Sequence, residues 1–369
     1  MNINKKMSTF IPSPRKYRPA RWEDVFGQDP IINVLRNEII NEHLHNAYLF
    51  CGQQGVGKTT VARIFARAIN CEKARDNNGN PCGECLKCQQ DVFFELDAAS
   101  NNSVDDVRNI IDQVSYGNSL ATYNVFIIDE VHMLSVAAFN AFLKTLEEPP
   151  QKTIFILATT EYQKVPATII SRCQCFNFQR IPLESIVEQL KIVLKDKGIE
   201  YEDEALYIIA EKADGALRNA LSMIDGIIAF CEDGLLSIQS VRDMFNLLDE
   251  DEYFYICDIM LKHDIPGVIM AFNNILQRGF SIQSFLDGLL THFMNLLLVS
   301  DEMTATLLNI SPEQMGKYKK QASMFTSISL QDIIEVINTD SVSYRISVNK
   351  KFFVVTMLIK IIKSLDENK

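Results

Sequence analysis

The sequence predicts a parallel α/β domain followed by helical domains, and three observations support this fold class. Short, strongly apolar segments at 47–51 and 125–129 are each followed by a turn signal and a helical pattern, and a third apolar segment covers 153–159. Buried strands that alternate with helices are typical of a parallel sheet covered on both faces. After about residue 180 the apolar residues recur with the 3.6-residue period of helices.

The length of the chain predicts more than one domain. A chain of 369 residues exceeds what one ordinary hydrophobic core holds, and an apolar content of 47% is enough for several cores. We expect an α/β domain at residues 1–180, a small helical domain at 181–245 and an all-helical domain at 246–369. Glycines after helical patterns, such as Gly198, are expected helix stops.

Composition favours a protein without a membrane span. Charged residues make up 22% of the chain and no apolar run approaches 18 residues, so we expect no membrane-spanning helix. The basic, polar segment 1–22 lacks the hydrophobic stretch of a secretory signal, which favours a cytoplasmic location. Thiols stay reduced there, and nine cysteines, an odd number, cannot all form disulfides, so clustered cysteines indicate a metal.

The net charge of −11 is unevenly divided along the chain. Residues 1–180 carry 19 basic and 19 acidic side chains, so the whole excess of acid lies in 181–369. Six Lys or Arg and no acid occur in residues 1–22. The first half can therefore present a basic face to nucleic-acid phosphates, whereas the second half would repel them.

A phosphate-binding loop lies between the first predicted strand and the helix after it. Residues 52–60, GQQGVGKTT, fit the pattern G-x-x-x-x-G-K-[ST] in the strand, loop and helix context that the motif requires. Amides of the loop and the N-terminus of the helix are expected to bind phosphates. Lys58 is expected to reach the β- and γ-phosphates and Thr59 to bind Mg²⁺. The predicted nucleotide-binding residues of the loop are Gly52, Gln53, Gln54, Gly55, Val56, Gly57, Lys58, Thr59 and Thr60.

An acidic pair ends the second predicted strand, VFIIDE. Asp129 is expected to hold Mg²⁺, and Glu130 to orient or polarise the attacking water. A solvated turn is the ordinary interpretation of such a pair, but a phosphate loop in the same domain favours the catalytic one. A glutamate beside the magnesium-binding acid favours hydrolysis over retention of the nucleotide. His132 is expected to cap or pack at the start of the following helix.

Threonines and arginines further along the chain are candidates for sensing the γ-phosphate. Thr159 and Thr160 close the third predicted strand, and either hydroxyl would face the phosphate or the water. Arg172, in SRCQC, is either a surface residue or one that stabilises charge at the γ-phosphate of a neighbouring subunit. Arg218 lies early in a helix of the second predicted domain, where it would contact the nucleotide of its own chain.

The order of these motifs resembles the AAA+ ATPases of sliding-clamp loaders. The matching segments are RPARWEDVFGQ, GQQGVGKTT, VFIIDEVHMLS, NAFLKTLEEPP, LATTE, SRC and GALRNALS. With the four cysteines of residues 71–88, the resemblance narrows to the gamma/tau subunits of the bacterial DNA polymerase III clamp loader. It is dense over residues 15–225 and weaker after about 245.

The resemblance implies ATP and Mg²⁺ as cofactors, an AAA+ domain with a zinc-binding insert, a helical lid and a helical oligomerisation collar. It implies that Tyr17, Arg18, Pro19 and Val25 to Gln28 line the adenine pocket. It implies that Lys58 and Thr59 belong to the Walker A motif, and Asp129 and Glu130 to the Walker B motif. It also implies that Thr159 or Thr160 is sensor 1, Arg172 is the trans arginine finger and Arg218 is sensor 2. Implied partners are delta and delta-prime type subunits, further copies of this chain, the β sliding clamp and primer–template DNA held by its phosphates. We expect the shorter, gamma-like form, without the tau extension and without a polymerase active site.

Four cysteines after the phosphate loop predict a structural zinc site. Cys71, Cys82, Cys85 and Cys88 have the spacing C-x10-C-x2-C-x2-C, which supplies the four thiolates of a closed tetrahedral site. An iron–sulfur cluster and an unmetallated cluster are the alternatives, although the x3-C-P continuation of ferredoxins is missing. Zinc would leave no position open for water and would serve folding rather than catalysis. The other five cysteines are expected to be buried or partly buried thiols: Cys51, Cys173, Cys175, Cys231 and Cys257.

Three functions follow from these motifs. The leading hypothesis is an ATPase motor subunit of a clamp-loader complex, which couples ATP binding and hydrolysis to opening the clamp and loading it onto primer–template DNA. The alternatives are a non-hydrolysing, nucleotide-bound scaffold of the replisome and another AAA+ DNA-remodelling ATPase. The intact loop lysine and acidic pair argue against a scaffold, and the four-cysteine insert with SRC disfavours another remodelling ATPase.

Overall fold

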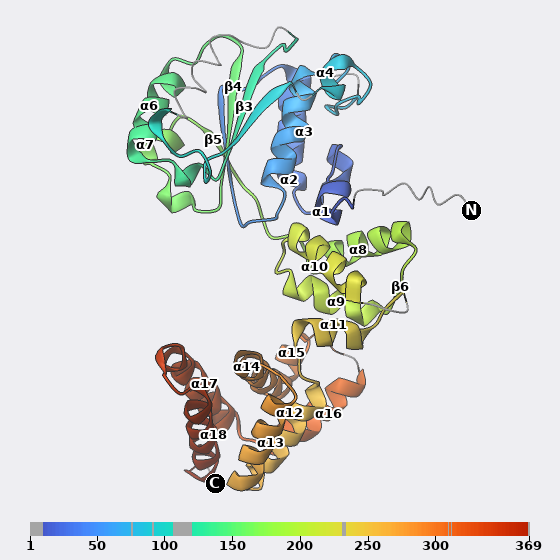
Figure 1. Cartoon of the computed structure of the whole chain (residues 1–369), viewed down its shortest axis with the longest axis vertical. Coiled ribbons are helices and arrows are strands. Elements are labelled where there is room, and N and C mark those ends of the chain that lie inside the picture. Colours follow the sequence, from blue (N-terminus) through green and yellow to red (C-terminus); the bar gives the residue numbers. More distant parts are fainter. Residues whose placement is uncertain are drawn as a thin grey trace, which may run out of the picture. The chain divides into compact units, whose positions relative to one another are not determined.

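The computed structural model describes residues 10–74, 77–90, 92–105, 120–230, 234–308, 310 and 312–367. The chain forms two compact units, divided between Ile238 and Gln239. The first holds a parallel sheet with helices, and the second is helical wherever its described residues form regular structure (Figure 1). The predicted boundary at 245–246 lies beyond this division. The predicted boundary at 180–181 falls inside the first unit, so a separate lid domain stays a prediction.

Five parallel strands form the sheet of the first unit. In chain order they are β1 (Ala47–Cys51), β2 (Phe93–Asp97), β3 (Asn124–Asp129), β4 (Thr153–Thr159) and β5 (Gln174–Asn177), and in space the order is β2-β3-β4-β1-β5. The three central strands are those predicted from apolar runs. Cys51 is paired with Thr159, and Asp97 with Asp129. The carboxyl ends of the strands therefore share one edge of the sheet, where ligands bind in parallel α/β folds.

Helices lie on the two faces of the sheet (Figure 1), and alternate side chains of the strands pack against them. Tyr48 and Phe50 lie in one core with residues of α2 (Asp29–Asn41) and α3 (Lys58–Asn70). Leu49 lies in the opposite core with Phe142 and other residues of α6 (Val136–Glu147). Burying a large apolar side chain contributes about 1.5–3 kcal/mol, so these two cores hold the strand ends in a fixed register.

Short elements connect the strands with the larger helices. They are α1 (Ser13–Lys16), the 3-10 helix η1 (Trp22–Asp24), α4 (Leu86–Gln89), the 3-10 helices η2 (Val131–Met133) and η3 (Tyr162–Lys164), and α7 (Ala167–Ile170). Both η2 and η3 follow the carboxyl end of a central strand. They therefore turn the chain at the edge of the sheet where the candidate residues lie.

A helical lid follows the sheet within the first unit. It consists of α8 (Leu183–Lys197), α9 (Asp203–Lys212) and α10 (Leu217–Phe230), with the short strands β6 (Glu200–Tyr201) and β7 (Leu235–Leu236) paired in parallel. Gly198 ends α8 in the left-handed conformation, as predicted. α1 packs on α10, where the Ser13 amide and hydroxyl both donate to the Asp225 carboxylate at 2.6 Å. The N-terminal segment is thereby tied to the lid.

The second unit is a helical bundle. Its helices, with α11 beginning at the division, are α11 (Ile238–Phe245), α12 (Glu250–Leu261), α13 (Ile265–Gln277), α14 (Ile282–Val299), α15 (Glu302–Ala305), α16 (Pro312–Ala322), α17 (Ser327–Ile346) and α18 (Lys350–Glu367). Phe272, Phe285 and Phe293 are fully buried in one core with residues of α12, α17 and α18. A continuous apolar core of this kind makes the bundle a folding unit of its own.

The composition of α14 bears on the expectation that the chain has no membrane-spanning helix. Its 18 residues have a mean hydropathy of 1.3, so by length and composition this helix is able to cross a membrane, and no other helix of the described residues is. α14 packs against α16 and α17 of the same bundle. Its buried His292 lies 2.8 Å, Nε2 to Oε1, from Gln321 of α16. These contacts are those of a central core helix, which passes the same test of length and composition.

Candidate functional site

Glycines allow the loop between β1 and α3 to take the shape of a phosphate-binding loop. Gly52 has a φ of 147°, and a Cβ there would lie 2.6 Å from the Phe178 carbonyl oxygen. Gly57 caps α3 with a φ of 108°, and a Cβ at this position would meet no atom within 4 Å. The N-terminus of α3 therefore faces open space, where free amides and the helix dipole stabilise an anion.

Lys58 is held in place by the loop itself. It is only 5% exposed, and its Nζ donates to the carbonyl oxygens of Gly52 at 2.8 Å and Gln53 at 2.9 Å. Burial lowers the pKa of Lys58, and the carboxylates of Glu130 and Asp129 act in the opposite direction. An ammonium group fixed beside the loop amides is placed to bind phosphate oxygens.

Thr59 and Asp129 meet between the loop and the end of β3. The Thr59 hydroxyl donates to Asp129 Oδ2 at 2.7 Å, and the amide of Glu130 donates to Oδ1 at 3.0 Å. Mg²⁺ takes oxygen ligands and is usually bound by one or two protein groups together with water and phosphate. The hydroxyl and carboxylate of this pair fit that requirement beside a nucleotide phosphate.

Glu130 is fixed in an uncommon backbone conformation beside this pair. Its φ of 49° and ψ of 44° are left-handed, which costs about 1–2 kcal/mol for a residue with a Cβ. Thr160, directly after β4, donates its hydroxyl to Glu130 Oε2 at 3.0 Å. Residues held in strained conformations by their surroundings cluster at functional sites. The structure therefore brings Glu130 together with Thr160 in front of the loop.

His132 joins this cluster, which the sequence did not reveal. Its Nδ1 lies 3.1 Å from Thr159 Oγ1 and 3.4 Å from Glu130 Oε2, and its Nε2 lies 3.3 Å from Glu161 Oε1. Thr159 is fully buried and accepts a hydrogen bond from the Glu161 amide at 3.0 Å. His132 thus links Glu130 with the end of β4, which is more than capping or packing. The sequence carries no mark of these contacts, because they join η2 to the end of β4 and the residues after it.

A pocket connects the phosphate loop with the N-terminal segment and the lid. It is lined by Pro14, Tyr17, Arg18, Pro19, Val25 and Phe26, by Gln54 to Thr60 with Asp129 and Glu130, and by Ile181, Leu217, Arg218 and Leu221. This lining combines apolar side chains with loop amides, cations and carboxylates, as a site for a base and phosphates requires. Gly52 and Gln53 do not line it, and their carbonyl oxygens hold Lys58 instead.

Gln28 and Arg172 also lie outside this pocket, as do Gly27, Thr159 and Thr160. Gln28, expected beside the base, is buried and donates to the Gln179 carbonyl oxygen at 2.7 Å. Arg172 is partly exposed, and its guanidinium bonds to Glu147 Oε1 at 2.6 Å and to the Thr168 carbonyl oxygen at 2.8 Å. The site of a single chain therefore contains Arg218 of the lid but not Arg172.

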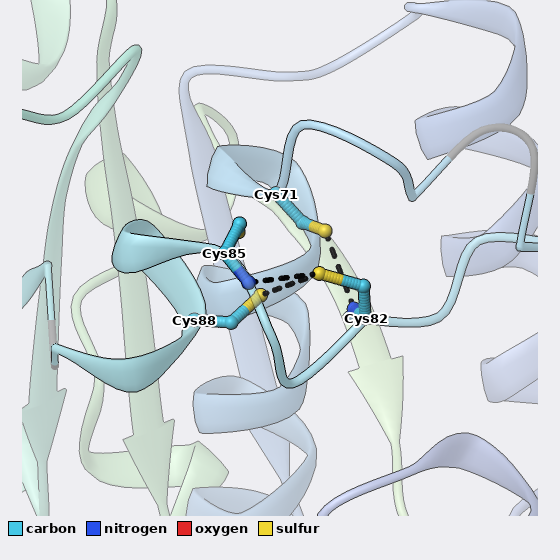
Figure 2. Close-up of side chains that lie close together, drawn as sticks. All are labelled: Cys71, Cys82, Cys85 and Cys88. Atoms are coloured by element: carbon cyan, nitrogen blue, oxygen red, sulfur yellow. Dashed lines mark hydrogen bonds between the residues drawn. The ribbon is translucent and has the colours of Figure 1, made fainter.

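The four cysteines of the insert converge on one point (Figure 2). Their Sγ atoms lie within 4.8 Å of one another, and the sulfurs of Cys82 and Cys88 are 3.9 Å apart. Four backbone amides donate to the sulfurs of Cys71 and Cys82 at 3.3–3.4 Å. The hydrogen bond from the Cys85 amide is the main cause that lowers the pKa of Cys82 to about 6. Burial instead raises the pKa of Cys71 and Cys88. Four soft sulfur donors in one place fit zinc.

The remaining cysteines differ in exposure. Cys51 and Cys257 are buried and Cys173 is half-buried, as predicted. Cys175 is exposed, so that expectation is wrong. It lies on the edge strand β5, where alternate side chains face solvent. Cys231 lies outside the described residues.

Two stretches of the chain match known protein families. Residues 27–182 match the family described as DNA polymerase III, delta subunit, and residues 185–233 match the DNA polymerase III clamp loader subunit, ATPase lid domain. Among solved structures, the RuvB Holliday junction branch migration motor of Thermotoga maritima covers 70% of this chain and 85% of its own. That alignment has 17% identity and a TM-score of 0.49, which is too weak to carry an argument.

Curated relatives of the chain are subunits of DNA polymerase III. It is 38% identical to subunit tau of Bacillus subtilis over 359 residues, which cover 94% of this chain and 62% of the relative. It is 41% identical to subunit tau of Escherichia coli over 278 residues, which cover 74% of this chain and 43% of the relative. The chain thus spans only part of the length of these two relatives.

A third relative matches over most of its own length. The chain is 37% identical to subunit gamma of Buchnera aphidicola over 278 residues, which cover 74% of each chain. The predicted class, an α/β AAA+ domain with a helical lid and C-terminal helices, is confirmed by these families and by the observed elements. The chain belongs to the gamma/tau subunit family of DNA polymerase III.

Proposed function

We propose that this chain is an ATP-hydrolysing motor subunit of a DNA polymerase III clamp loader. It would use ATP binding and hydrolysis to open the β sliding clamp and load it onto primer–template DNA, and it would have no polymerase active site of its own. One observation carries the proposal. In a chain of the gamma/tau family, Thr59 is bonded to Asp129 and Thr160 to Glu130 in front of the helix that follows the loop.

Residues at the edge of the sheet would have separate roles in hydrolysis. Lys58 would bind the β- and γ-phosphates, and Thr59 with Asp129 would hold Mg²⁺. Glu130 would orient the attacking water and accept its proton. The hydrogen bond from Thr160 to Glu130 supports Thr160, rather than the buried Thr159, as the residue that senses the γ-phosphate.

The base and ribose of ATP would lie between the N-terminal segment and the lid. Tyr17 and Arg18 line the pocket from one side, and Arg218 would reach the phosphates from α10. The same helix carries Asp225, which holds Ser13. We therefore expect a movement of the lid on nucleotide binding to carry the N-terminal segment with it.

Assembly would complete the site. Arg172 lies outside its own pocket, which suits a role at the γ-phosphate bound by a neighbouring subunit. To act there it would leave its ion pair with Glu147, and an exposed pair of this kind contributes only about 0.2–1 kcal/mol. Partners would be further copies of the chain, delta and delta-prime type subunits, the β clamp and the phosphates of DNA. The helical domain at 246–369 would serve as the oligomerisation collar, and the complex would act in the cytoplasm.

The cysteine cluster would bind one structural zinc ion. Four protein thiolates leave no coordination position for water, so the site would not take part in hydrolysis. Cys71 follows directly on Asn70, the last residue of α3. Bound metal would therefore fold the insert against the end of the helix that begins at the phosphate loop.

ATP hydrolysis with and without the proposed partners tests the function. The chain would be combined with delta and delta-prime type subunits, and phosphate release measured alone and with β clamp plus primed DNA. We expect clamp and DNA together to stimulate release, and Glu130→Gln to slow it by about 10²–10⁴-fold while ATP still binds. Glu204→Gln, which removes an exposed carboxylate of α9, is the matched control.

The two possible failures are distinguishable. Hydrolysis that does not respond to clamp and DNA would contradict clamp loading but leave an ATPase. ATP binding without any hydrolysis would contradict the motor role and favour a nucleotide-bound scaffold.

A further inference from the structure

A second hollow of the first unit adjoins the nucleotide pocket and is lined by five arginines. They come from three segments: Arg15 and Arg18 from α1 and the residues after it, Arg63 and Arg67 from α3, and Arg218 from α10. Among the described residues, no acidic side chain lines this arginine groove. The groove and the nucleotide pocket share Arg18 and Arg218, so a ligand in one would lie next to a ligand in the other.

The charge of the arginine groove is only partly neutralised by the protein. Arg63 holds Glu95 through two bonds of 2.6 and 2.7 Å. No carboxylate of the described residues lies within 4.0 Å of the guanidinium of Arg15, Arg18 or Arg218. Burial lowers the pKa of Arg18, as does repulsion from the guanidiniums of Arg63, Arg218 and Arg15, while Glu95 acts in the opposite direction. Bound anion would relieve this repulsion.

Two lysines near the arginine groove are instead paired with carboxylates of the protein. Lys16 lies between Arg15 and Arg18 in the sequence, yet its Nζ is 2.6 Å from Asp196 Oδ2. Lys197 is likewise paired with Asp225 at 2.6 Å. The two lysines are therefore neutralised within the protein, while neighbouring arginines line the groove.

The walls of the arginine groove are fixed by contacts outside it. Ser13 ties α1 to Asp225 of α10 through two bonds of 2.6 Å. Arg63 and Arg67 extend from α3, whose other residues are largely buried against the sheet. Cations that are already positioned lose less entropy when they bind a ligand.

We propose that the arginine groove is a second phosphate-binding site, separate from the phosphate loop, for a phosphate-bearing ligand: the backbone of a nucleic-acid strand or a small polyphosphate. Guanidinium groups present paired donors that match phosphate oxygens. An acidic protein segment fits less well, because the lining offers no aromatic or large aliphatic side chain to bury its residues. Arginine contacts to phosphates position a strand without reading its sequence, so a strand would be held mainly by its phosphates. The inference does not depend on ATP hydrolysis.

Binding of two phosphate probes to the whole chain tests this proposal. The nucleotide pocket is first filled with a non-hydrolysable ATP analogue and Mg²⁺, and then a labelled 12-nucleotide single strand or inorganic tripolyphosphate is titrated. Arg15→Gln combined with Arg67→Gln should weaken probe binding by about tenfold or more, and should reduce the salt slope for the single strand by about 1.4. Affinity for the ATP analogue should stay unchanged, because neither residue lines the nucleotide pocket.

A charge-matched pair and a charge-preserving pair serve as controls. Arg21→Gln with Lys212→Gln removes two exposed cations that do not line the groove, and should leave binding nearly unchanged. Arg15→Lys with Arg67→Lys should keep most of the affinity if charge is what binds. Thermal unfolding of each variant shows whether the fold is retained.

Each outcome decides the proposal. Binding of the strand alone identifies nucleic acid as the source of the phosphates, and binding of tripolyphosphate alone identifies a small polyphosphate. If Arg15→Gln with Arg67→Gln and Arg21→Gln with Lys212→Gln weakened probe binding equally, general surface charge would explain the binding, and the proposed site would be overturned. Absence of binding by both probes, or equally tight binding of a polyglutamate of matched charge, would overturn it as well.

Discussion

The nucleotide pocket and the cysteine insert lie at opposite ends of α3 and are held together in different ways. At the start of the helix, Thr59, Asp129 and Glu130 are positioned by strands whose residues are almost entirely buried. At its end, no residue from 82 to 90 is buried, and α4 buries none of its four residues. The sulfurs of the insert are bonded to amides of the insert itself.

This difference predicts that the cysteine insert depends on a bound metal for its fold, whereas the nucleotide pocket does not depend on nucleotide. The pocket keeps its shape through the cores on both faces of the sheet, so we expect it to persist when nucleotide leaves. The insert has few buried side chains to oppose its conformational entropy, which costs about 1–2 kcal/mol per residue for the backbone. Metal binding would have to supply that stability. Variants in each region can separate the two cases.

Loss of the loop lysine should have the largest effect. Lys58→Ala removes the cation proposed to bind the β- and γ-phosphates, and we expect hydrolysis to fall by about 10²–10³-fold. Lys58 lines the nucleotide pocket, where water can replace its bonds to the Gly52 and Gln53 carbonyl oxygens, so the unfolding temperature should change little. Phosphate release and thermal unfolding measure the two effects, with Lys195→Ala as the control on an exposed face of α8. If Lys58→Ala unfolded instead, the shape of the loop would depend on the Lys58 side chain, which contradicts this expectation.

Removal of the metal should affect the other region. We expect about one zinc per chain, and structural sites of this type bind with about 10–16 kcal/mol. Chelation or Cys88→Ser should open residues 82–90 to protease, while nucleotide affinity should stay within about threefold, because the two sites share no partners. Cys175→Ser is the control, since this cysteine is exposed and outside the cluster. Loss of nucleotide binding together with the metal would mean that α3 couples the two regions.

The two threonines after β4 provide a finer test within the pocket. Thr160→Val removes the donor to Glu130 Oε2 and should slow turnover about tenfold, as expected for loss of a hydrogen bond to a charged group. Thr159→Val places an apolar group at the fully buried Oγ1 position and removes the acceptor of the partly buried Glu161 amide, so it should lower the free energy of unfolding by about 1–3 kcal/mol. Steady-state kinetics and denaturant unfolding of both variants compare the effects. A larger loss of turnover in Thr159→Val would reverse the assignment of the sensing residue.

Features that depend on local sequence were the ones that could be predicted. The bounds of β1 and β4 match the predicted runs because buried parallel strands are apolar throughout and end at turn residues. The cysteine cluster follows from the spacing of residues 71–88. Edge strands were missed: β2 has the sequence FFELD, with two acids, and β5 has only four residues. Neither shows a buried run.

Features that depend on how distant segments meet could not be predicted. The choice between Thr159 and Thr160 requires the direction of each side chain at the end of β4, which alternates from residue to residue. The arginine groove requires α1 to pack on α10, more than 200 positions along the chain.

His132 makes contacts of this second kind within the nucleotide site, because it joins η2 to the end of β4. Its ring lies within 3.4 Å of Glu130 and of Thr159, so it restrains the carboxylate proposed to orient water. His132→Gln keeps a polar side chain but cannot reproduce the contacts of both ring nitrogens. Loss of a hydrogen bond worth about 1 kcal/mol predicts turnover about fivefold slower, with KM for ATP nearly unchanged, since His132 does not line the pocket. His43→Gln, at an exposed position, is the control. If His132→Gln instead raised KM with turnover unchanged, the histidine would act on nucleotide binding, and the restraint on Glu130 would have no role in hydrolysis.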